Sequence, residues 1–125
     1  MSAILLVDDN RAVRNAVGDV LRDAGYSVSE AASGSEALSL LERSPFDLLM
    51  VDYLLPEMKG DAIAKAARER CPTLRVAFLS GYTEFLSLTG KAGADTLIAK
   101  PISSEDLRHA VANVLEGSGS FAHAA

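Results

Sequence analysis

Two short apolar runs that end in aspartate decide the fold: AILLVDD at residues 3–9 and LLMVD at residues 48–52. Nearly continuous aliphatic runs of this length are typical of strands that are buried on both faces of a sheet. A helical pattern follows each run, and parallel neighbours need such crossover connections. The two runs therefore predict parallel strands in the middle of an α/β sheet.

Three more apolar runs extend this alternation, and the five predicted strands cover residues 3–7, 26–28, 48–51, 74–79 and 96–99. Apolar residues repeat at helical spacing from Val13 to Ala24, including Ala16, and this stripe should face the sheet. Gly25 stops that helix. Ser33 and Glu36 form a capping box for a second helix, and Ser103 is the expected cap of the last one. The weakest helical pattern covers 84–91.

The second strand alternates with polar residues, which favours a place at the edge of the sheet. The predicted fold is a doubly wound, five-stranded parallel sheet of order 2-1-3-4-5 with helices on both faces, which is flavodoxin-like. In this order the connections reverse direction between strands one and three. Ligands bind there, at the carboxyl ends of the strands.

Functional groups stand at those strand ends: Asp8 and Asp9 after strand one, Asp52 after strand three, Ser80 after strand four and Lys100 after strand five. Each residue alone has an ordinary structural explanation, but the fold gathers all of them in one crevice. Three adjacent carboxylates repel one another unless a cation neutralises them. Mg²⁺ is the expected ion, because it binds carboxylates and commonly shares its remaining sites with a phosphoryl group.

The sequence resembles the receiver domains of two-component response regulators from Ile4 to Glu116. The residues that carry the resemblance are Asp8-Asp9, Asp52 with Pro56 and Gly60 beyond it, Ser80-Gly81, Gly93-Ala94-Asp95 and Lys100-Pro101.

The resemblance implies that Asp52 accepts a phosphoryl group from a histidine kinase or a histidine phosphotransfer protein. It also implies that Asp8, Asp9, Asp52 and the backbone carbonyl of Leu54 bind Mg²⁺, that Ser80 is the switch hydroxyl, and that Lys100, after which a cis peptide bond precedes Pro101, contacts the phosphoryl oxygens. Such a domain is a signalling module that catalyses its own phosphorylation and dephosphorylation. Neither the cognate kinase nor the downstream target protein is identified by the sequence.

Two positions bear on how the domain would work. Many receivers carry an aromatic residue three positions before the lysine, where this chain has Leu97, so the usual aromatic coupling is in doubt. The alternative function is a metal-dependent aspartyl phosphohydrolase. Such enzymes usually carry a second aspartate two residues after the nucleophile, and this chain has Leu54 there.

The first turn of the helix after Asp9 borders the crevice. We therefore expect Asn10, Arg11, Val13 and Arg14 to form part of the surface that receives the phosphodonor protein.

Composition limits the remaining possibilities. The 125 residues, 49% of them apolar, predict one receiver domain over 1–116 and a flexible tail or truncated linker over 117–125. The net charge of −5 and the scattered arginines argue against direct binding of nucleic acid. No apolar run approaches the roughly 20 residues that cross a bilayer, and no signal peptide opens the chain, so we expect a cytoplasmic protein without membrane contact.

Overall fold

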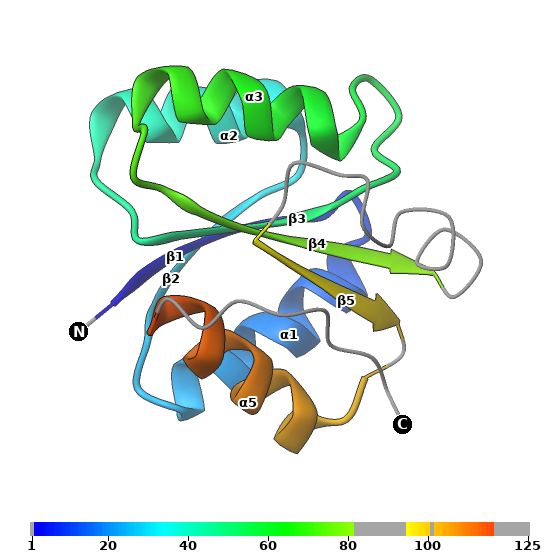
Figure 1. The fold of residues 1–125 in the computed structure, drawn as a ribbon. Coiled ribbons are helices and arrows are strands. Elements are labelled where there is room, and N and C mark those ends of the chain that lie inside the picture. Colours follow the sequence, from blue (N-terminus) through cyan, green and yellow to red (C-terminus); the bar gives the residue numbers. More distant parts are fainter. Residues whose placement is uncertain (1, 82–94, 101, 117–125) are drawn as a thin grey trace.

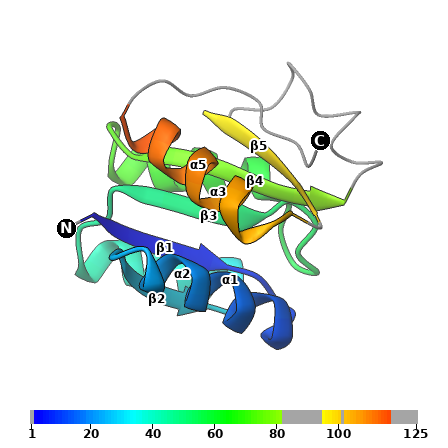
Figure 2. The same ribbon diagram turned by 90° about the horizontal axis from the view of Figure 1, so that it is seen from below.

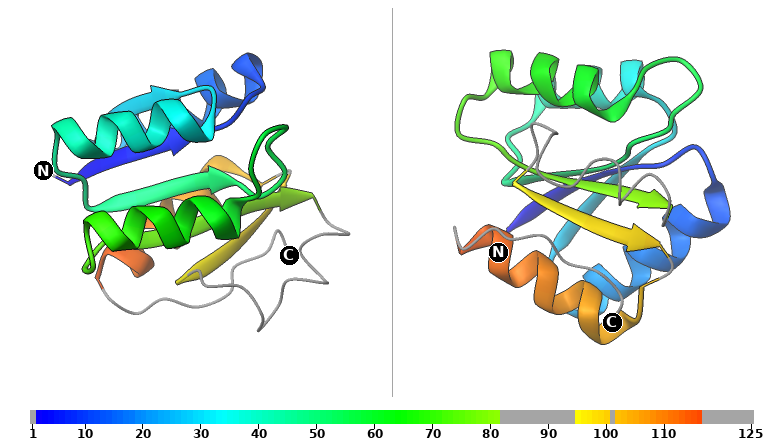
Figure 3. Two further views of the ribbon diagram at one scale, coloured as in Figure 1. Left: turned by 90° about the horizontal axis from the view of Figure 1, so that it is seen from above. Right: turned by 45° about the vertical axis from the view of Figure 1, so that its right-hand side comes forward.

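The computed structural model describes residues 2–81, 95–100 and 102–116. They form a sheet of parallel strands in the order β2-β1-β3-β4-β5, with every arrowhead toward one end of the sheet (Figure 3). The predicted strand order is confirmed. The strands are β1 (Ala3–Val7), β2 (Ser27–Ala31), β3 (Leu48–Asp52), β4 (Arg75–Gly81) and β5 (Thr96–Lys100).

Helices cover both faces of the sheet. One face carries α2 (Gly34–Arg43) and α3 (Gly60–Arg70), and the other carries α1 (Arg11–Asp23) and α5 (Ser104–Leu115) (Figure 1, Figure 2). The doubly wound class is therefore confirmed, while the helix predicted over 84–91 lies outside the described residues. Among the helices that the structure describes, none is long and apolar enough to cross a membrane.

The sheet separates two layers of core. Because successive side chains of a strand point to opposite faces, Val51 and Phe78 pack on the side of α2 and α3, whereas Met50 and Leu79 pack on the side of α1 and α5. Leu97 is fully buried in the layer on the side of α2 and α3. The central strands thus place apolar side chains on both faces of the sheet, as expected for strands covered on both faces.

Side-chain caps fix where three of the described helices begin, with Asn10 capping α1, Ser33 capping α2 and Ser103 capping α5. The backbone N–H of Glu36 donates to Ser33 Oγ at 3.2 Å, and that of Asp106 donates to Ser103 Oγ at 3.1 Å, as predicted. The Glu36 carboxylate accepts from the backbone N–H of Ala32 at 2.7 Å. In the usual capping box the glutamate accepts from the backbone N–H of the cap residue, which here is Ser33. Glu36 instead accepts from the residue before the cap.

The prediction was wrong in several details, including strand bounds that differ by one to three residues. β2 covers Ser27–Ala31 because it pairs with β1 along its full length. β4 runs on through Ser80, which pairs with Ala99, so this serine lies inside the strand instead of after it. Ala16 and Ala24 are exposed and do not face the sheet; Ala24 follows the last helical residue, and Ala16 borders an open groove.

Gly60 allows α3 to begin directly against the end of β3. Its backbone N–H donates to the carbonyl of Tyr53 at 2.8 Å. A Cβ atom at position 60 would lie 3.0 Å from the Cα and 3.2 Å from the Cδ1 of Tyr53. The backbone contact can be relieved only by moving the segment that follows Asp52.

We expect Gly60→Ala to lower the free energy of unfolding by about 1–3 kcal/mol, the usual effect of inserting a group into a packed site. Urea unfolding followed by circular dichroism measures it. Ser104→Ala, at the exposed first residue of α5, is the matched control and should change stability by no more than about 0.5 kcal/mol. Unchanged stability of Gly60→Ala would contradict the close approach.

Candidate functional site

Three carboxylates meet where β1 and β3 end. Val7 lies opposite Val51 in the register of these neighbouring strands, so the residues that follow, Asp8 and Asp52, come side by side. Asp8, Asp9 and Asp52 each contribute an oxygen, and these oxygens lie within 4.8 Å of one another. Asp8 is fully buried, Asp52 is 9% exposed and Asp9 is exposed. The structure thus brings together the carboxylates that the sequence singled out.

Lys100 reaches the same cluster from β5. Its Nζ donates to Asp8 Oδ2 at 3.3 Å and lies 3.5 Å from Asp52 Oδ2. Because β4 separates β5 from β3 in the sheet, only a long side chain can span this distance. One ammonium group is therefore shared between two buried carboxylates.

Asp8 is held through all four of its polar atoms. Its backbone N–H donates to the carbonyl of Ala31 at 3.2 Å, and its carbonyl accepts from Arg14 Nη1 at 2.8 Å. Oδ1 accepts from the backbone N–H of Asn10 at 2.9 Å, and Oδ2 accepts from Lys100. This carboxylate consequently has a fixed orientation.

The Asp52 carboxyl lies in a less favourable electrostatic environment. Burial raises its pKa above the ordinary value, the ammonium of Lys100 opposes that shift, and repulsion from Asp8 adds to it. The backbone N–H of Leu54 donates to Asp52 Oδ1 at 3.3 Å and favours the charged form. The net pKa is raised, so the negative charge at this position is incompletely compensated.

Ser80, expected from the sequence to be the hydroxyl of the site, lies near the end of β4. Its side chain is buried, and its Oγ has no hydrogen-bond partner within the described part of the chain. The next residue, Gly81, pairs with Lys100 across β4 and β5. The hydroxyl therefore lies close to the strand ends that carry the charged groups and is free to bond a new acceptor. Pro101, which the inferred cis peptide bond precedes, lies outside the described residues.

Tyr53 packs beside the site without joining the cluster. Its ring meets Phe78 edge-on, with the ring centroids 5.4 Å apart. Burial raises the pKa of its phenol, and the neighbouring Asp61 carboxylate adds to the shift. The phenol thus stays protonated beside the first turn of α3. No sequence signal singled out Asp61 for this contact.

Residues 4–112 match the family described as the response regulator receiver domain. The chain belongs to this family. It is accordingly a receiver domain, a phosphoacceptor of two-component signalling.

Known receiver proteins of different length resemble the chain. It is 32% identical to the response regulator receiver protein CpdR of Brucella abortus over 117 residues, which is 92% of this chain and 98% of that protein. It is 35% identical to the sensor kinase CckA of the same organism over 122 residues, which is 92% of this chain but only 13% of the kinase.

A solved receiver structure is also similar. The response regulator TrrA of Thermotoga maritima, determined in complex with Mg²⁺-BeF, has a TM-score of 0.82 and 26% identity, and the match covers 91% of this chain and 99% of that one.

The first turn of α1 differs from the expected donor surface of the receiver. Arg14 was predicted to face an incoming protein, but its side chain is only 15% exposed and pairs with Glu30, with Nε 3.1 Å from Oε1. Asn10 is likewise engaged, because its Oδ1 accepts from the backbone N–H of Val13 at 3.1 Å. Arg11 is exposed and Val13 is half-buried. Of the four residues, Arg11 and Val13 fit the expected surface.

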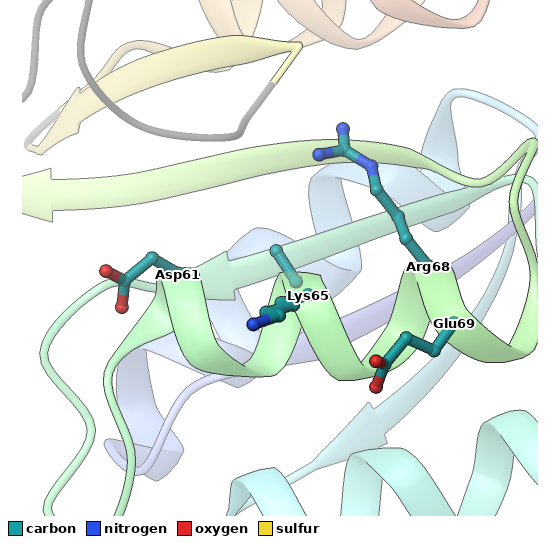
Figure 4. A pocket seen from close by; sticks show the side chains of 5 residues that line it. Asp61, Lys65, Arg68 and Glu69 are labelled. Carbon is teal, nitrogen blue, oxygen red and sulfur yellow. The ribbon is translucent and has the colours of Figure 1, made fainter.

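Two of the hollows among the described residues lie along the receiver's helices. One, of about 340 Å³, opens beside Lys100 and is lined by Val13, Ala16, Val17, Leu79, Lys100 and Ile102. The other, of about 380 Å³, follows α3, where Figure 4 shows side chains of both charges, Asp61, Lys65, Arg68 and Glu69. Only the first lies against the charged site.

The raised pKa of Asp52 makes the stability of the metal-free receiver depend on pH. Between the ordinary and the raised pKa, the folded state binds more protons than the unfolded state, so the free energy of unfolding falls as pH rises through that window. At neutral pH, ionised Asp52 therefore destabilises the fold.

We expect Asp52→Asn in excess chelator to raise the free energy of unfolding at neutral pH by about 1 kcal/mol, a common size for one substitution. The gain should shrink at acidic pH, where the wild-type carboxyl is protonated. Urea unfolding at both pH values measures this. Asp19→Asn, on the 77% exposed side chain of α1, is the control and should show no such gain. A less stable Asp52→Asn at neutral pH would contradict the electrostatic argument.

Proposed function

We propose that Asp52 is the phosphoacceptor of this receiver and that it takes its phosphoryl group from the phosphohistidine of a histidine kinase or histidine phosphotransfer protein in a Mg²⁺-dependent reaction. The observation that carries the proposal is the Asp8, Asp9 and Asp52 cluster with Lys100 between two of its members. Asp52 is the member that ends the central strand β3 and retains 9% exposure, so a phosphodonor can reach it.

The donor set fits a hard divalent cation. Three carboxylates facing one ammonium leave a net charge of about −2, since −3 + 1 = −2, which one divalent cation neutralises. Asp8, Asp9, Asp52 and the Leu54 carbonyl would hold Mg²⁺. The ion, when bound, supplies positive charge that stabilises the transferring phosphoryl group. The TrrA complex with Mg²⁺-BeF supports the same ion in a related domain.

The chain's own groups account for the transfer. An Asp52 oxygen attacks the phosphorus, the bond from phosphorus to the imidazole nitrogen breaks, and the imidazole keeps the electron pair and takes up a proton. Lys100 already lies 3.5 Å from Asp52 Oδ2 and would contact the phosphoryl oxygens. Because imidazole is a good leaving group, the reaction needs no protein base.

The switch would use Ser80 and Lys100 together. Each hydrogen bond to a charged acceptor contributes about 1.5–3 kcal/mol, so two of them supply about 3–6 kcal/mol. Moving a conformational ratio from 1:99 to 99:1 takes about 5.5 kcal/mol. The Ser80 hydroxyl, which has no partner in the described residues, can form its bond without breaking another. Leu97, fully buried and apolar, would transmit the change only by packing.

The hydrolase alternative lacks support at one position. Leu54, two residues after Asp52, is 47% exposed and has no acidic group that could protonate an alcohol leaving group. The chain also spans only a small part of CckA, so the activity of any longer protein containing it is a separate question. The proposal includes a histidine kinase as a partner and an unidentified downstream target protein that responds to phosphorylation.

The phosphoacceptor assignment predicts that acetyl phosphate with Mg²⁺ adds one phosphoryl group to the wild-type chain, as seen by intact-mass spectrometry. Asp52→Ala and excess chelator should each abolish the addition. Asp23→Ala, at an exposed carboxylate of α1, is the control and should label fully.

Labelling of Asp52→Ala at the wild-type yield would show that another residue is the acceptor. The same preparation is then offered a simple aryl phosphate ester. Sustained turnover would favour the phosphohydrolase instead of the receiver reaction.

The corrected donor surface predicts a distinct effect for Arg11, which is exposed at the start of α1. Arg11→Glu should slow phosphotransfer from a phosphorylated histidine phosphotransfer protein that labels the wild type, by about tenfold, because charge steers the encounter. Labelling by acetyl phosphate should be unchanged. Rapid-quench kinetics with both donors measure this.

Arg43→Glu makes the same charge reversal at the exposed end of α2, on the other face of the sheet. It should leave both reactions unchanged. Equal slowing by Arg11→Glu with protein and small donors would mean that Arg11 acts on the chemistry and not on docking.

A further inference from the structure

Arg14 connects the edge strand β2 to the acidic cluster. It lies in the second half of the first turn of α1, and its guanidinium makes two contacts. Nη1 donates to the backbone carbonyl of Asp8 at 2.8 Å, and Nε donates to Glu30 Oε1 at 3.1 Å. Only 15% of the Arg14 side chain is exposed. Ion pairs withdrawn from solvent in this way are stronger than ion pairs at the surface.

Glu30 is fixed from a second side. Its Oε2 accepts from Arg22 Nη2 at 2.8 Å, and Arg22 lies about two turns beyond Arg14 along α1. Gly18 lies between the two arginines, and a Cβ there would come within 3.1 Å of Arg22 Nη1 and 3.2 Å of Glu30 Oε2. The absence of a side chain at position 18 leaves room for the arrangement of Arg14, Glu30 and Arg22.

The bond from Arg14 acts on the backbone at the point where the chain leaves β1. Asp8 carries one carboxylate of the cluster and is followed at once by Asp9, which carries another. The donor from Arg14 holds the carbonyl that joins these two residues. The direction in which both carboxylates leave the backbone therefore depends on where the Arg14 guanidinium is held.

We propose that Arg14, anchored by Glu30, is a positioning residue that orients Asp8 and Asp9 for divalent-cation binding. This inference rests on the proposed function, since it concerns the same Mg²⁺ site. Groups that hold metal ligands in place typically change metal affinity by about 10- to 100-fold when removed. The expected loss of Mg²⁺ affinity is opposite to what charge alone predicts. Without the positive charge of Arg14, the site would be more negative and should attract the cation more strongly.

The test is Mg²⁺ binding to the full chain, measured by titration of amide chemical shifts at neutral pH and constant ionic strength. Dispersed spectra and urea unfolding in chelator report whether each variant is folded. Arg14→Gln should weaken Mg²⁺ binding by about tenfold in spite of the lost positive charge. Arg14→Lys, which keeps the charge but cannot bridge Asp8 and Glu30 with a planar fork, should weaken it as well.

Arg22→Gln is the matched control, because Arg22 pairs with the same Glu30 and does not contact Asp8. It should lower stability and leave the Mg²⁺ affinity within about twofold of wild type, less than loss of a ligand-supporting group costs. If Arg14→Gln does not fold, Arg14→Lys decides alone.

Mg²⁺ binding by the folded Arg14 variants at wild-type strength or tighter would overturn the inference, as would an equal loss in Arg22→Gln. Both results leave the proposed function intact. Absence of Mg²⁺ binding by the wild-type chain would instead refute the proposed metal site itself.

Discussion

Repulsion among carboxylates at the ends of two adjacent parallel strands is the constraint on which the rest of this structure depends. The register of β1 and β3 places Asp8 beside Asp52, and no relaxation of side chains alone can separate them. Lys100 and the backbone N–H groups of Asn10 and Leu54 donate to these carboxylates. Arg14 donates to the backbone carbonyl of Asp8. These contacts do not offset the whole cost, since burial and, to a lesser extent, repulsion from Asp8 keep the pKa of Asp52 raised.

The sheet order and the convergence of the charged residues could be predicted because both follow from short-range patterns. A polar alternation marks β2 as an edge, and apolar runs mark β1 and β3 as central. The carboxyl ends of parallel strands lie at one edge of the sheet. Asp52 and Lys100 therefore come close together, although 47 residues lie between them in the sequence.

What the sequence did not reveal depends on contacts between elements. Helical periodicity places Arg14 near the acidic pair, but whether its guanidinium faces solvent or Glu30 is decided by how α1 lies over β2. The same packing leaves Ala16 exposed beside a groove that helical spacing alone would have closed. The apolar run stops at Leu79 and so placed Ser80 at the end of its strand, whereas pairing with Ala99 keeps this serine inside β4.

The unpaired hydroxyl of Ser80 has a consequence for the energetics of signalling. Among the described residues its Oγ bonds nothing, and a buried polar group left in that condition costs about 1–3 kcal/mol. In the proposed switch, a deficit of this kind would raise the free energy of the conformation described here before any signal arrives. Part of the driving force would then come from ending the deficit when Ser80 gains an acceptor, so the two conformations of the proposed switch would lie closer in free energy than their other contacts alone imply.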